Sequence, residues 1–139
     1  DAAIVAMGVP PTRDSLAIGN AVVDTARQLC LSVKVIGSTD LTHYGDNYGL
    51  ASHGTGPAAV AWVRRENDRR VIEAMLDLDP ERVIDEALKN QNACCPGAAA
   101  TAIQAGKHLG TAVAESITYA TSYDRSPGDS FVGYVGIVF

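Results

Sequence analysis

Positive charge is scarce in this sequence and nowhere concentrated. Lysine and arginine together number 11 among 139 residues, against 16 aspartates and glutamates, which gives a formal net charge of -5. The two basic pairs, at 64–65 and 69–70, are interleaved with Glu66 and Asp68. A protein that binds nucleic acid neutralises phosphates with a basic face, and this chain has none. We therefore expect no nucleic acid partner.

Long apolar runs are also missing. No stretch approaches the roughly 20 apolar residues that cross a bilayer, so we expect no membrane partner. The start, Asp1 to Met7, has no basic segment before its apolar residues and does not resemble a secretion signal. Because it opens without an initiator Met, we expect a trimmed chain, a processed product or one piece of a longer protein.

Cysteine is rare, with three residues: Cys30, Cys94 and Cys95. An odd number does not make a disulfide framework. The two neighbours could only close a small, strained ring with each other. We therefore expect a reducing compartment, the cytoplasm.

Apolar residues make up 47% of the chain, enough for the core of one domain of this length, and we treat 1–139 as a single α/β domain. An apolar run at 2–9 is typical of a buried strand. Apolar residues at helical spacing follow over 14–29, and a second apolar run covers 31–36. Strand, helix and strand predict a βαβ unit with parallel strands.

The remaining pattern predicts a loop, three helices and a hairpin. A glycine-rich loop covers 39–57. Helices are expected over 58–76, 79–90 and 96–109, and strands over 113–121 and 131–139. Since no helix separates the last two strands, they should pair antiparallel. The fold class is α/β, a mixed sheet flanked by helices.

Asp40 and His43 are the first candidate site. They follow the second apolar run, and in such sheets sites gather beyond the carboxyl ends of strands. A carboxylate near an imidazole can orient the ring and raise its basicity, as a general base requires. The alternative is that Asp40 caps a turn while His43 packs or binds water.

Cys94 and Cys95 are the second candidate, because they directly precede a helix expected to begin at Pro96. Backbone dipoles at a helix N-terminus favour thiolate over thiol, and a thiolate can ligate a metal or attack an electrophile. The alternative is that both pack as small hydrophobes, which is also how we interpret Cys30.

The other histidines and the tyrosines carry weaker signals. His53 lies in the loop and could line a pocket, as could Tyr44. His108 falls in the last turn of a helix, where the carbonyl end of the dipole favours a partly cationic ring. Packing explains most of the tyrosines.

Three stretches together resemble the Memo-like family, a branch of the class III extradiol ring-cleavage dioxygenase superfamily. They are GSTDLTHYGDNYG at 37–49, NACCPGAAATAI at 92–103 and the end of the chain, VGYVGIVF, at 132–139. Their order matches the C-terminal half of such proteins. The resemblance implies an α/β fold with a pocket for a non-haem metal, typically Fe(II).

The resemblance also assigns roles. Cys94 stands where the ring-cleaving relatives place a carboxylate ligand, and His43 corresponds to their acid and base, supported by Asp40. Cys95 stands where relatives often have Gly, so its role stays open. The activity implied is O2-dependent cleavage of a small aromatic diol by an oxidoreductase.

In that family two metal-binding histidines lie on segments outside the matched region. We therefore expect the N-terminal half or a second subunit to supply them, in an oligomer or complex. If that half is absent, no cofactor is expected. The thiolate could also favour Cu or Zn, which leaves a non-catalytic metal-binding or scaffold protein as the alternative. A third hypothesis is a metal-free thiol hydrolase using Cys94, His43 and Asp40.

Overall fold

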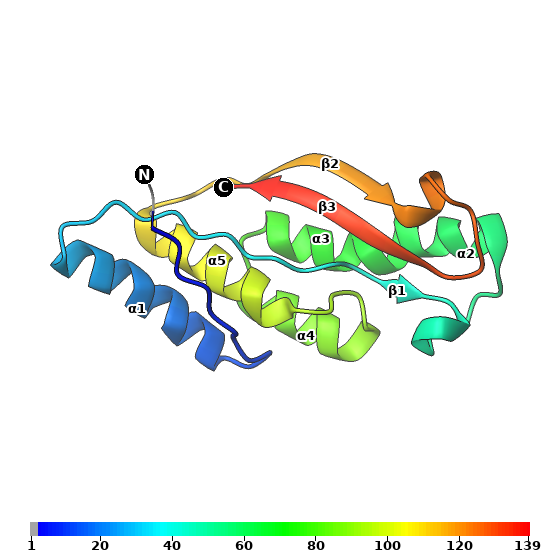
Figure 1. The fold of residues 1–139 in the computed structure, drawn as a ribbon, viewed down its shortest axis with the longest axis horizontal. Coiled ribbons are helices and arrows are strands. Elements are labelled where there is room, and N and C mark those ends of the chain that lie inside the picture. The colour runs from blue at the N-terminus through cyan, green and yellow to red at the C-terminus, as the bar shows by residue number, and fades with distance from the viewer. Residues whose placement is uncertain (1–2) are drawn as a thin grey trace.

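The computed structural model describes residues 3–139. Its helices are α1 (Asp14–Gln28), α2 (Gly56–Trp62), α3 (Asp68–Leu76), α4 (Pro80–Asn90) and α5 (Pro96–Leu109). The strands are β1 (His43–Tyr44), β2 (Glu115–Thr121) and β3 (Phe131–Val138), and short 3-10 turns cover Asp46–Tyr48 and Ser122–Asp124. Helices lie along one side of the sheet, which confirms the mixed α/β fold class (Figure 1).

Local sequence signals set the helix ends. At α4, Asp79 Oδ1 accepts a hydrogen bond from the backbone N–H of Arg82 at 3.1 Å, and Pro80 occupies the first turn. Helix α5 begins at Pro96 and stops at Gly110, whose φ of 103° suits glycine. Both helices are where the sequence predicts them.

The helix expected over 58–76 contains an irregularity. A π-helical turn, Val63–Asn67, joins α2 to α3, so the three segments follow one another without a break. Such wide turns occur frequently at functional sites. Here the turn ends at Asn67 and α3 begins at Asp68, and these two buried polar residues bond to Thr42, next to His43.

The sheet has the strand order β1-β3-β2, with both pairs antiparallel. The hairpin of β2 and β3 is as predicted. Strand β1 was not predicted, because a two-residue strand inside a glycine-rich loop exists only through its pairing with β3, where His43 lies opposite Val132. This pairing fixes His43 on the edge of the sheet.

The segments 3–9 and 31–36 form no strand within residues 3–139, although the sequence predicts a strand at each. They flank α1. The helix of the expected βαβ unit is therefore present, but the two segments on either side of it are not paired as strands. A strand needs a neighbour about 4.8 Å away to accept its hydrogen bonds, and neither segment has one in the described part of the chain. Ile4 and Ile36 are 92% and 91% exposed.

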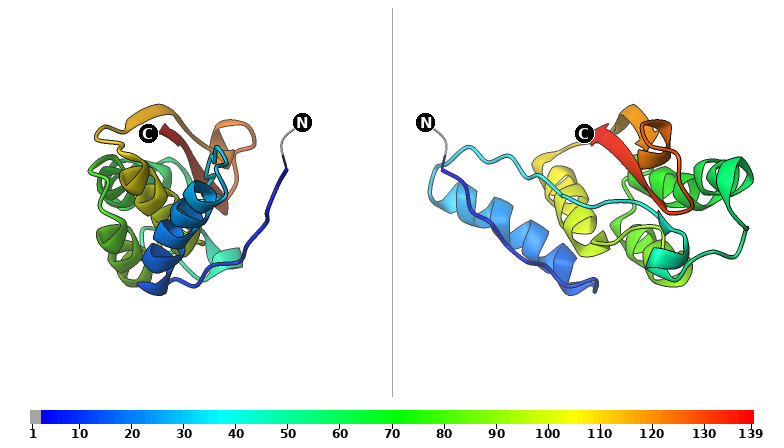
Figure 2. Two further views of the ribbon diagram at one scale, coloured as in Figure 1. Left: turned by 90° about the vertical axis from the view of Figure 1, so that its left-hand side faces the viewer. Right: turned by 45° about the vertical axis from the view of Figure 1, so that its right-hand side comes forward.

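Two buried clusters make the core. The larger one joins α3, α4 and α5 under the sheet, with Leu41, Val71 and Ile103 at its centre. The smaller one surrounds Tyr44 and Phe131. In Figure 2 the α1 end of the molecule stands apart from the sheet, and residues 3–9 run along it. Within residues 3–139, no helix combines the length and apolar character that crossing a membrane would require.

Candidate metal and acid-base site

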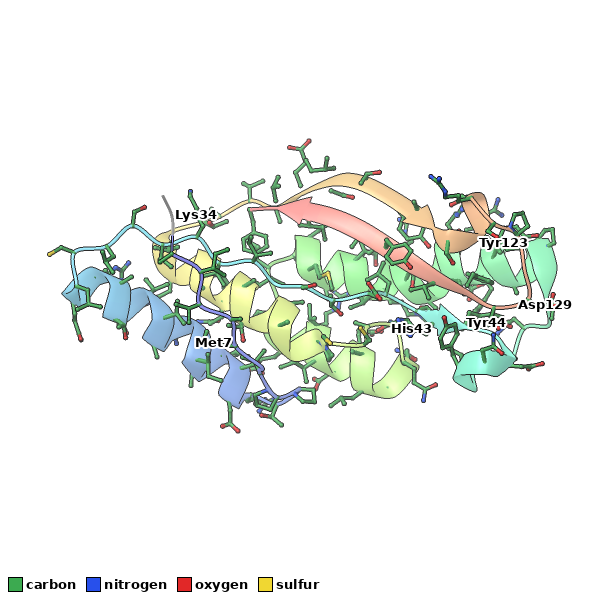
Figure 3. The ribbon with its side chains drawn as sticks, in the orientation of Figure 1. Met7, Lys34, His43, Tyr44, Tyr123 and Asp129 are labelled. Carbon is green, nitrogen blue, oxygen red and sulfur yellow. The ribbon has the colours of Figure 1, made fainter. Side chains whose placement is uncertain are left out.

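Asp40 and His43 lie on the segment that leads into β1. His43 Nε2 is 3.4 Å from Asp40 Oδ2, so the carboxylate faces the ring as the sequence pattern suggested. His43 and Tyr44 occupy neighbouring positions on β1 at the edge of the sheet (Figure 3). The two site side chains are partly open to solvent, at 34% for His43 and 48% for Asp40.

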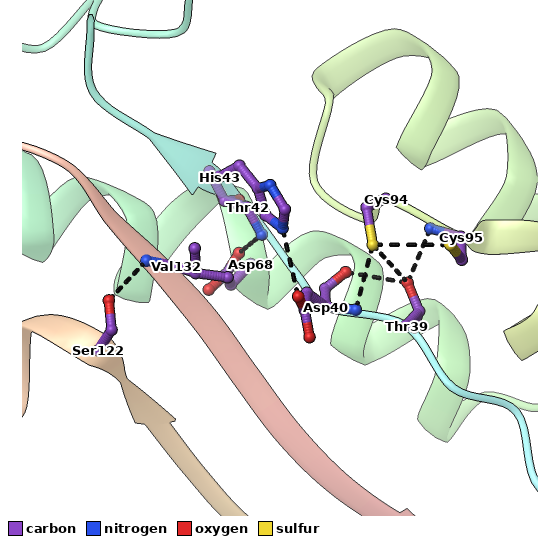
Figure 4. Close-up of polar contacts among 9 residues, drawn as sticks. All are labelled: Thr39, Asp40, Thr42, His43, Asp68, Cys94, Cys95, Ser122 and Val132. Atoms are coloured by element: carbon purple, nitrogen blue, oxygen red, sulfur yellow. Dashed lines mark hydrogen bonds and ion pairs between the residues drawn. The ribbon is translucent and has the colours of Figure 1, made fainter. Parts of the chain in front are cut away.

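Cys94 reaches the same place from the loop between α4 and α5. Its backbone N–H donates to Asp40 O at 3.0 Å, and its Sγ accepts from the Asp40 N–H at 3.3 Å. Figure 4 shows the sulfur pointing toward Asp40. This reciprocal pair holds two segments that are 54 residues apart in the chain.

Asp40, His43 and Cys94 together could hold a metal ion, because their ligand atoms all lie within 4.8 Å of one another. His43 Nε2 is hidden from water and has no hydrogen-bond partner, since its contact with Asp40 lacks hydrogen-bond geometry. Leaving a buried polar atom unpaired costs about 1–3 kcal/mol, so the nitrogen is suited to a ligand outside the chain. An oxygen, a nitrogen and a sulfur donor fit a transition metal.

Thr42, between Asp40 and His43, anchors the segment to α3. Its N–H donates to Asp68 Oδ1 at 3.0 Å, and its Oγ1 accepts from Asn67 Nδ2, also at 3.0 Å. Both bonds are buried. Asn67 is the last residue of the π-helical turn and Asp68 the first of α3, so both partners of Thr42 lie at the junction of these two segments.

Asp68 is a buried carboxyl in an unusual setting. Burial raises its pKa, while hydrogen bonds from Thr42 and Tyr119 pull the pKa down in part. Tyr119 OH donates to Asp68 Oδ2 at 2.7 Å. Burial and the negative charge of Asp68 raise the pKa of Tyr119, so its hydroxyl stays protonated and remains a donor. A side chain at Gly133 would collide with the Asp68 carboxyl.

Asn92 lies two residues before Cys94 and ties the same loop to the end of the π-helical turn. Its Nδ2 donates to Asn67 O at 2.9 Å, and the residue is fully buried. Asn67 and Asp68 were absent from the sequence prediction, and nothing in the sequence singles them out. Asn92 entered only as the first residue of the motif NACCPGAAATAI, without a role of its own.

Cys95 is the N-cap residue of α5, and its side chain makes no capping hydrogen bond. Its N–H donates to Thr39 Oγ1 at 3.0 Å, and its Sγ is 3.7 Å from that of Cys94. The hydrogen bond with Cys94, together with burial, raises the pKa of Cys95. The thiolate that the helix N-terminus was expected to favour is therefore disfavoured at Cys95.

A cavity of about 360 Å³ adjoins the cluster, with His43, Tyr48, Leu50 and Cys94 among its lining residues. The Tyr48 ring centroid lies 4.9 Å from that of His43, at 57° between the ring planes. Apolar and aromatic walls next to an acid-base group can accommodate a flat aromatic molecule.

Tyr44 and His53 lie away from this cavity. Tyr44 is fully buried, stacks on Phe131 at 5.2 Å, and accepts a hydrogen bond from the His53 N–H at 2.8 Å. The His53 ring stacks on Trp62 at 3.9 Å. Because the Tyr44 ring also lies 5.9 Å from that of Trp62, the two residues belong to one aromatic group that includes Trp62 and Phe131.

Cys30 and His108 complete the candidates. Cys30 is exposed and has a φ of 54°, so it follows the end of α1 on the surface and does not pack in the core as expected. His108 Nε2 lies 2.7 Å from Asp24 Oδ1 in the last turn of α5. That contact links α5 to α1 and is structural.

Comparison with known proteins agrees with the motifs. A family model described as Memo-like protein matches residues 3–138. A MEMO1 family protein of Pyrococcus furiosus is 33% identical over 136 residues, covering 96% of this chain and 47% of the relative. One from Thermococcus onnurineus is 36% identical over 124 residues, covering 88% and 43%. One from Methanopyrus kandleri is 35% identical over 138 residues, covering 97% and 44%.

The chain therefore belongs to the Memo-like family. It spans about half the length of the curated relatives it matches.

Proposed function

We propose that this chain supplies part of a non-haem metal pocket in which Cys94 is a metal ligand and His43 is the acid and base. The observation that carries the proposal is the cluster of Asp40, His43 and Cys94, with all ligand atoms within 4.8 Å. The reaction we infer is O2-dependent cleavage of a small aromatic diol, the chemistry of the superfamily that the motifs resemble.

His43 moves the proton in this proposal. Its Nε2 has no hydrogen-bond partner, so it can accept the proton of a substrate hydroxyl placed in the adjoining cavity. The carboxylate of Asp40, 3.4 Å away, stabilises the imidazolium that results and favours its later role as an acid. The Tyr48 ring offers a face for the substrate.

Cys94 provides the sulfur ligand, oriented by the Asp40 N–H. A ferrous ion bound there would supply the redox chemistry and open coordination positions that ring cleavage requires. A thiolate also suits copper or zinc, so the identity of the bound metal has to be determined by elemental analysis.

The ligand set is incomplete if His43 is kept as the base. We propose that two further histidines come from another polypeptide segment, either the N-terminal half of a longer protein or a second subunit. The exposed apolar segments support such a partner. Ile4, Val5 and Ile36 are between 81% and 92% exposed, and patches of this kind rarely stay bare on monomers.

A groove of about 510 Å³ runs between these segments and helices α1 and α5, with Val5, Met7, Val33 and Val35 among its lining residues. An additional strand from the partner could pair with either segment there. Sedimentation should therefore show an oligomer or a complex. A well-behaved monomer of this chain alone would contradict the partner.

A non-catalytic metal-binding or scaffold protein is the second candidate. The observation in its favour is that Asp40, His43 and Cys94 already offer three donors from one chain. In that case His43 is itself a ligand, and a ligated ring nitrogen cannot take a proton from a substrate.

The His43→Ala variant separates the two functions. In the assembled oxygenase it should keep the ferrous ion and lose O2 uptake with catechols, because only the base is removed. In a scaffold protein it should lose the metal. Cys30→Ser is the control, because Cys30 is exposed and outside the cluster. Failure of the wild-type assembly to bind iron would contradict the oxygenase.

The three cysteines are free thiols. Free thiols persist in reducing compartments, so the cytoplasm remains our prediction for the location.

A further inference from the structure

Cys94 and Cys95 carry adjacent thiols, and the proposed metal site uses only that of Cys94. Their sulfurs lie 3.7 Å apart and both residues are exposed. Figure 4 shows the contact between the two sulfurs, with the Thr39 side chain beside them. We propose that Cys94 and Cys95 form a reversible vicinal disulfide, which makes this pair a redox modification site.

Hydrogen bonds hold the Cys94 sulfur and the Cys95 backbone in place, and the two sulfurs contact each other directly. Cys94 Sγ accepts from the Asp40 N–H at 3.3 Å, while the Cys95 N–H donates to Thr39 Oγ1 at 3.0 Å. Both cysteines are thus tied to neighbouring residues of one segment, and α5 begins directly after them at Pro96. Little further ordering is needed to bring the thiols into reaction.

The oxidant we name is a hydroperoxide, ROOH. The sulfur of one cysteine, as thiolate, attacks the terminal peroxide oxygen. The O–O bond breaks, giving a sulfenic acid and, after protonation, ROH. The second sulfur attacks the sulfenic sulfur, the S–S bond forms, and the hydroxyl leaves as water with the thiol proton. Two thiols lose two electrons and the peroxide gains them, whichever cysteine reacts first.

The ring should reopen easily. Neighbouring Cα atoms are about 3.8 Å apart across a trans peptide, whereas disulfides usually join Cα atoms about 4.4–6.8 Å apart. The described residues contain no cis peptide bond. A strained disulfide is more readily reduced, and such bonds are the regulatory ones. The pair therefore suits a switch better than a permanent crosslink.

Closure would remove the Cys94 thiolate from the metal cluster, because a disulfide sulfur is a poor ligand. This consequence rests on the function proposed above. Disulfide formation itself depends only on the two thiols, so the two can be tested separately.

The experiment uses the protein with any polypeptide that copurifies with it, in a Cys30→Ser background that leaves two cysteines. Metal-free protein is treated with hydrogen peroxide, alkylated and analysed by intact mass and peptide mapping. We expect the two alkylatable thiols to be lost together, with two hydrogens fewer in mass, and to return with dithiothreitol. Persistent thiols, a disulfide between chains, or separate sulfinic acids would overturn the proposal.

Cys95→Ser is the matched variant, with Cys95→Ala as a second in case the first does not fold. Each keeps Cys94 and should lose the peroxide-induced mass change of two hydrogens. An unchanged loss in either folded variant would also overturn the proposal.

Cobalt(II) serves as the metal probe. Reduced protein and reduced Cys95→Ser should both bind it. In the protein with both cysteines, peroxide followed by catalase should abolish binding, and dithiothreitol should restore it. If reduced protein binds no cobalt while the disulfide still forms, the proposed function fails and the disulfide stands. If cobalt binds but no disulfide forms, the disulfide is overturned and the metal pocket stands.

Discussion

Residues 3–9 and residues 37–44 are both extended and rich in apolar or small side chains, but only the second segment is fixed by its neighbours. Leu41 N–H donates to Gly133 O at 2.9 Å, and the Gly133 N–H donates to Thr42 O at 3.0 Å. No comparable backbone bond involves 3–9 within the described residues. An extended segment is held in position only where another part of the chain forms hydrogen bonds with its backbone N–H and C=O groups.

The difference separates the candidate site from the exposed apolar segments. The fixed segment carries Asp40 and His43 and contacts Cys94, so the candidate site lies where backbone hydrogen bonds hold the chain. The unfixed segments at 3–9 and 31–36 present apolar surface. We infer that a partner segment binds to them. Its contacts would extend the sheet and supply the remaining metal ligands.

The largest effect is expected at Gly133, where β3 bonds to the fixed segment and lies against Asp68. Gly133→Ala would push a methyl group into the Asp68 carboxyl and disturb the backbone that pairs with Leu41. Overpacking of this kind costs about 1–3 kcal/mol. Urea denaturation should show a lower midpoint with an unchanged slope. In Gly136→Ala the added carbon meets only Thr118 Cγ2 at 3.6 Å, so an equal loss there would contradict the mechanism.

The second prediction removes the bond that ties the loop of Cys94 to the end of the π-helical turn. Asn92→Ala deletes the buried hydrogen bond from Asn92 Nδ2 to Asn67 O, at a cost of about 0.5–1.5 kcal/mol. We also expect weaker metal binding, because Cys94 is two residues away. Asn47→Ala is the matched control, since its side chain is exposed and makes no hydrogen bond within the described residues. Equal effects on metal binding in the two variants would exclude a positioning role.

The third prediction concerns acid titration. Folding raises the pKa of Asp68. The contribution of this carboxyl to the free energy of unfolding is therefore fully present below the ordinary pKa of 3.8, and it is lost as pH rises through the folded pKa. Asp68→Asn removes this loss, and its stability relative to wild type should rise with pH across that window. Denaturant midpoints at several pH values measure the trend.

Asp124 provides the contrasting case. Hydrogen bonds from Thr121 and Arg64 lower its pKa. Its contribution to folding stability is therefore present above pH 3.8 and is lost as pH falls through the folded pKa. The stability of Asp124→Asn should be closest to that of wild type in acid and fall below it as pH rises. A rise of relative stability with pH in both variants would contradict the assignment for Asp124, and a fall in both would contradict the assignment for Asp68.

The smallest effect on the isolated chain is expected at the unfixed segments. Ile4→Ser and Ile36→Ser alter residues that are more than nine-tenths exposed, so unfolding free energy should change by less than about 0.5 kcal/mol. Assembly should weaken measurably in sedimentation. Normal assembly with both substitutions would place the partner elsewhere.

Sequence patterns predicted the helices and the final hairpin because those elements depend on local signals such as Asp79, Pro96 and Gly110. They also brought Asp40 and His43 into one hypothesis through their spacing. Strand β1 and the roles of Asn67 and Asp68 depend on contacts between segments far apart in the chain, which no local pattern contains. The strands expected at 2–9 and 31–36 have apolar sequences but no neighbouring strand within residues 3–139.

The most direct test of the metal pocket is cobalt(II) titration of the reduced, assembled protein, followed by absorption of the thiolate-to-cobalt transition. We expect saturable binding with a thiolate band that disappears in Cys94→Ser and persists in Cys30→Ser. Binding without that band, or binding unchanged by Cys94→Ser, would contradict Cys94 as a ligand and with it the pocket built from Asp40, His43 and Cys94.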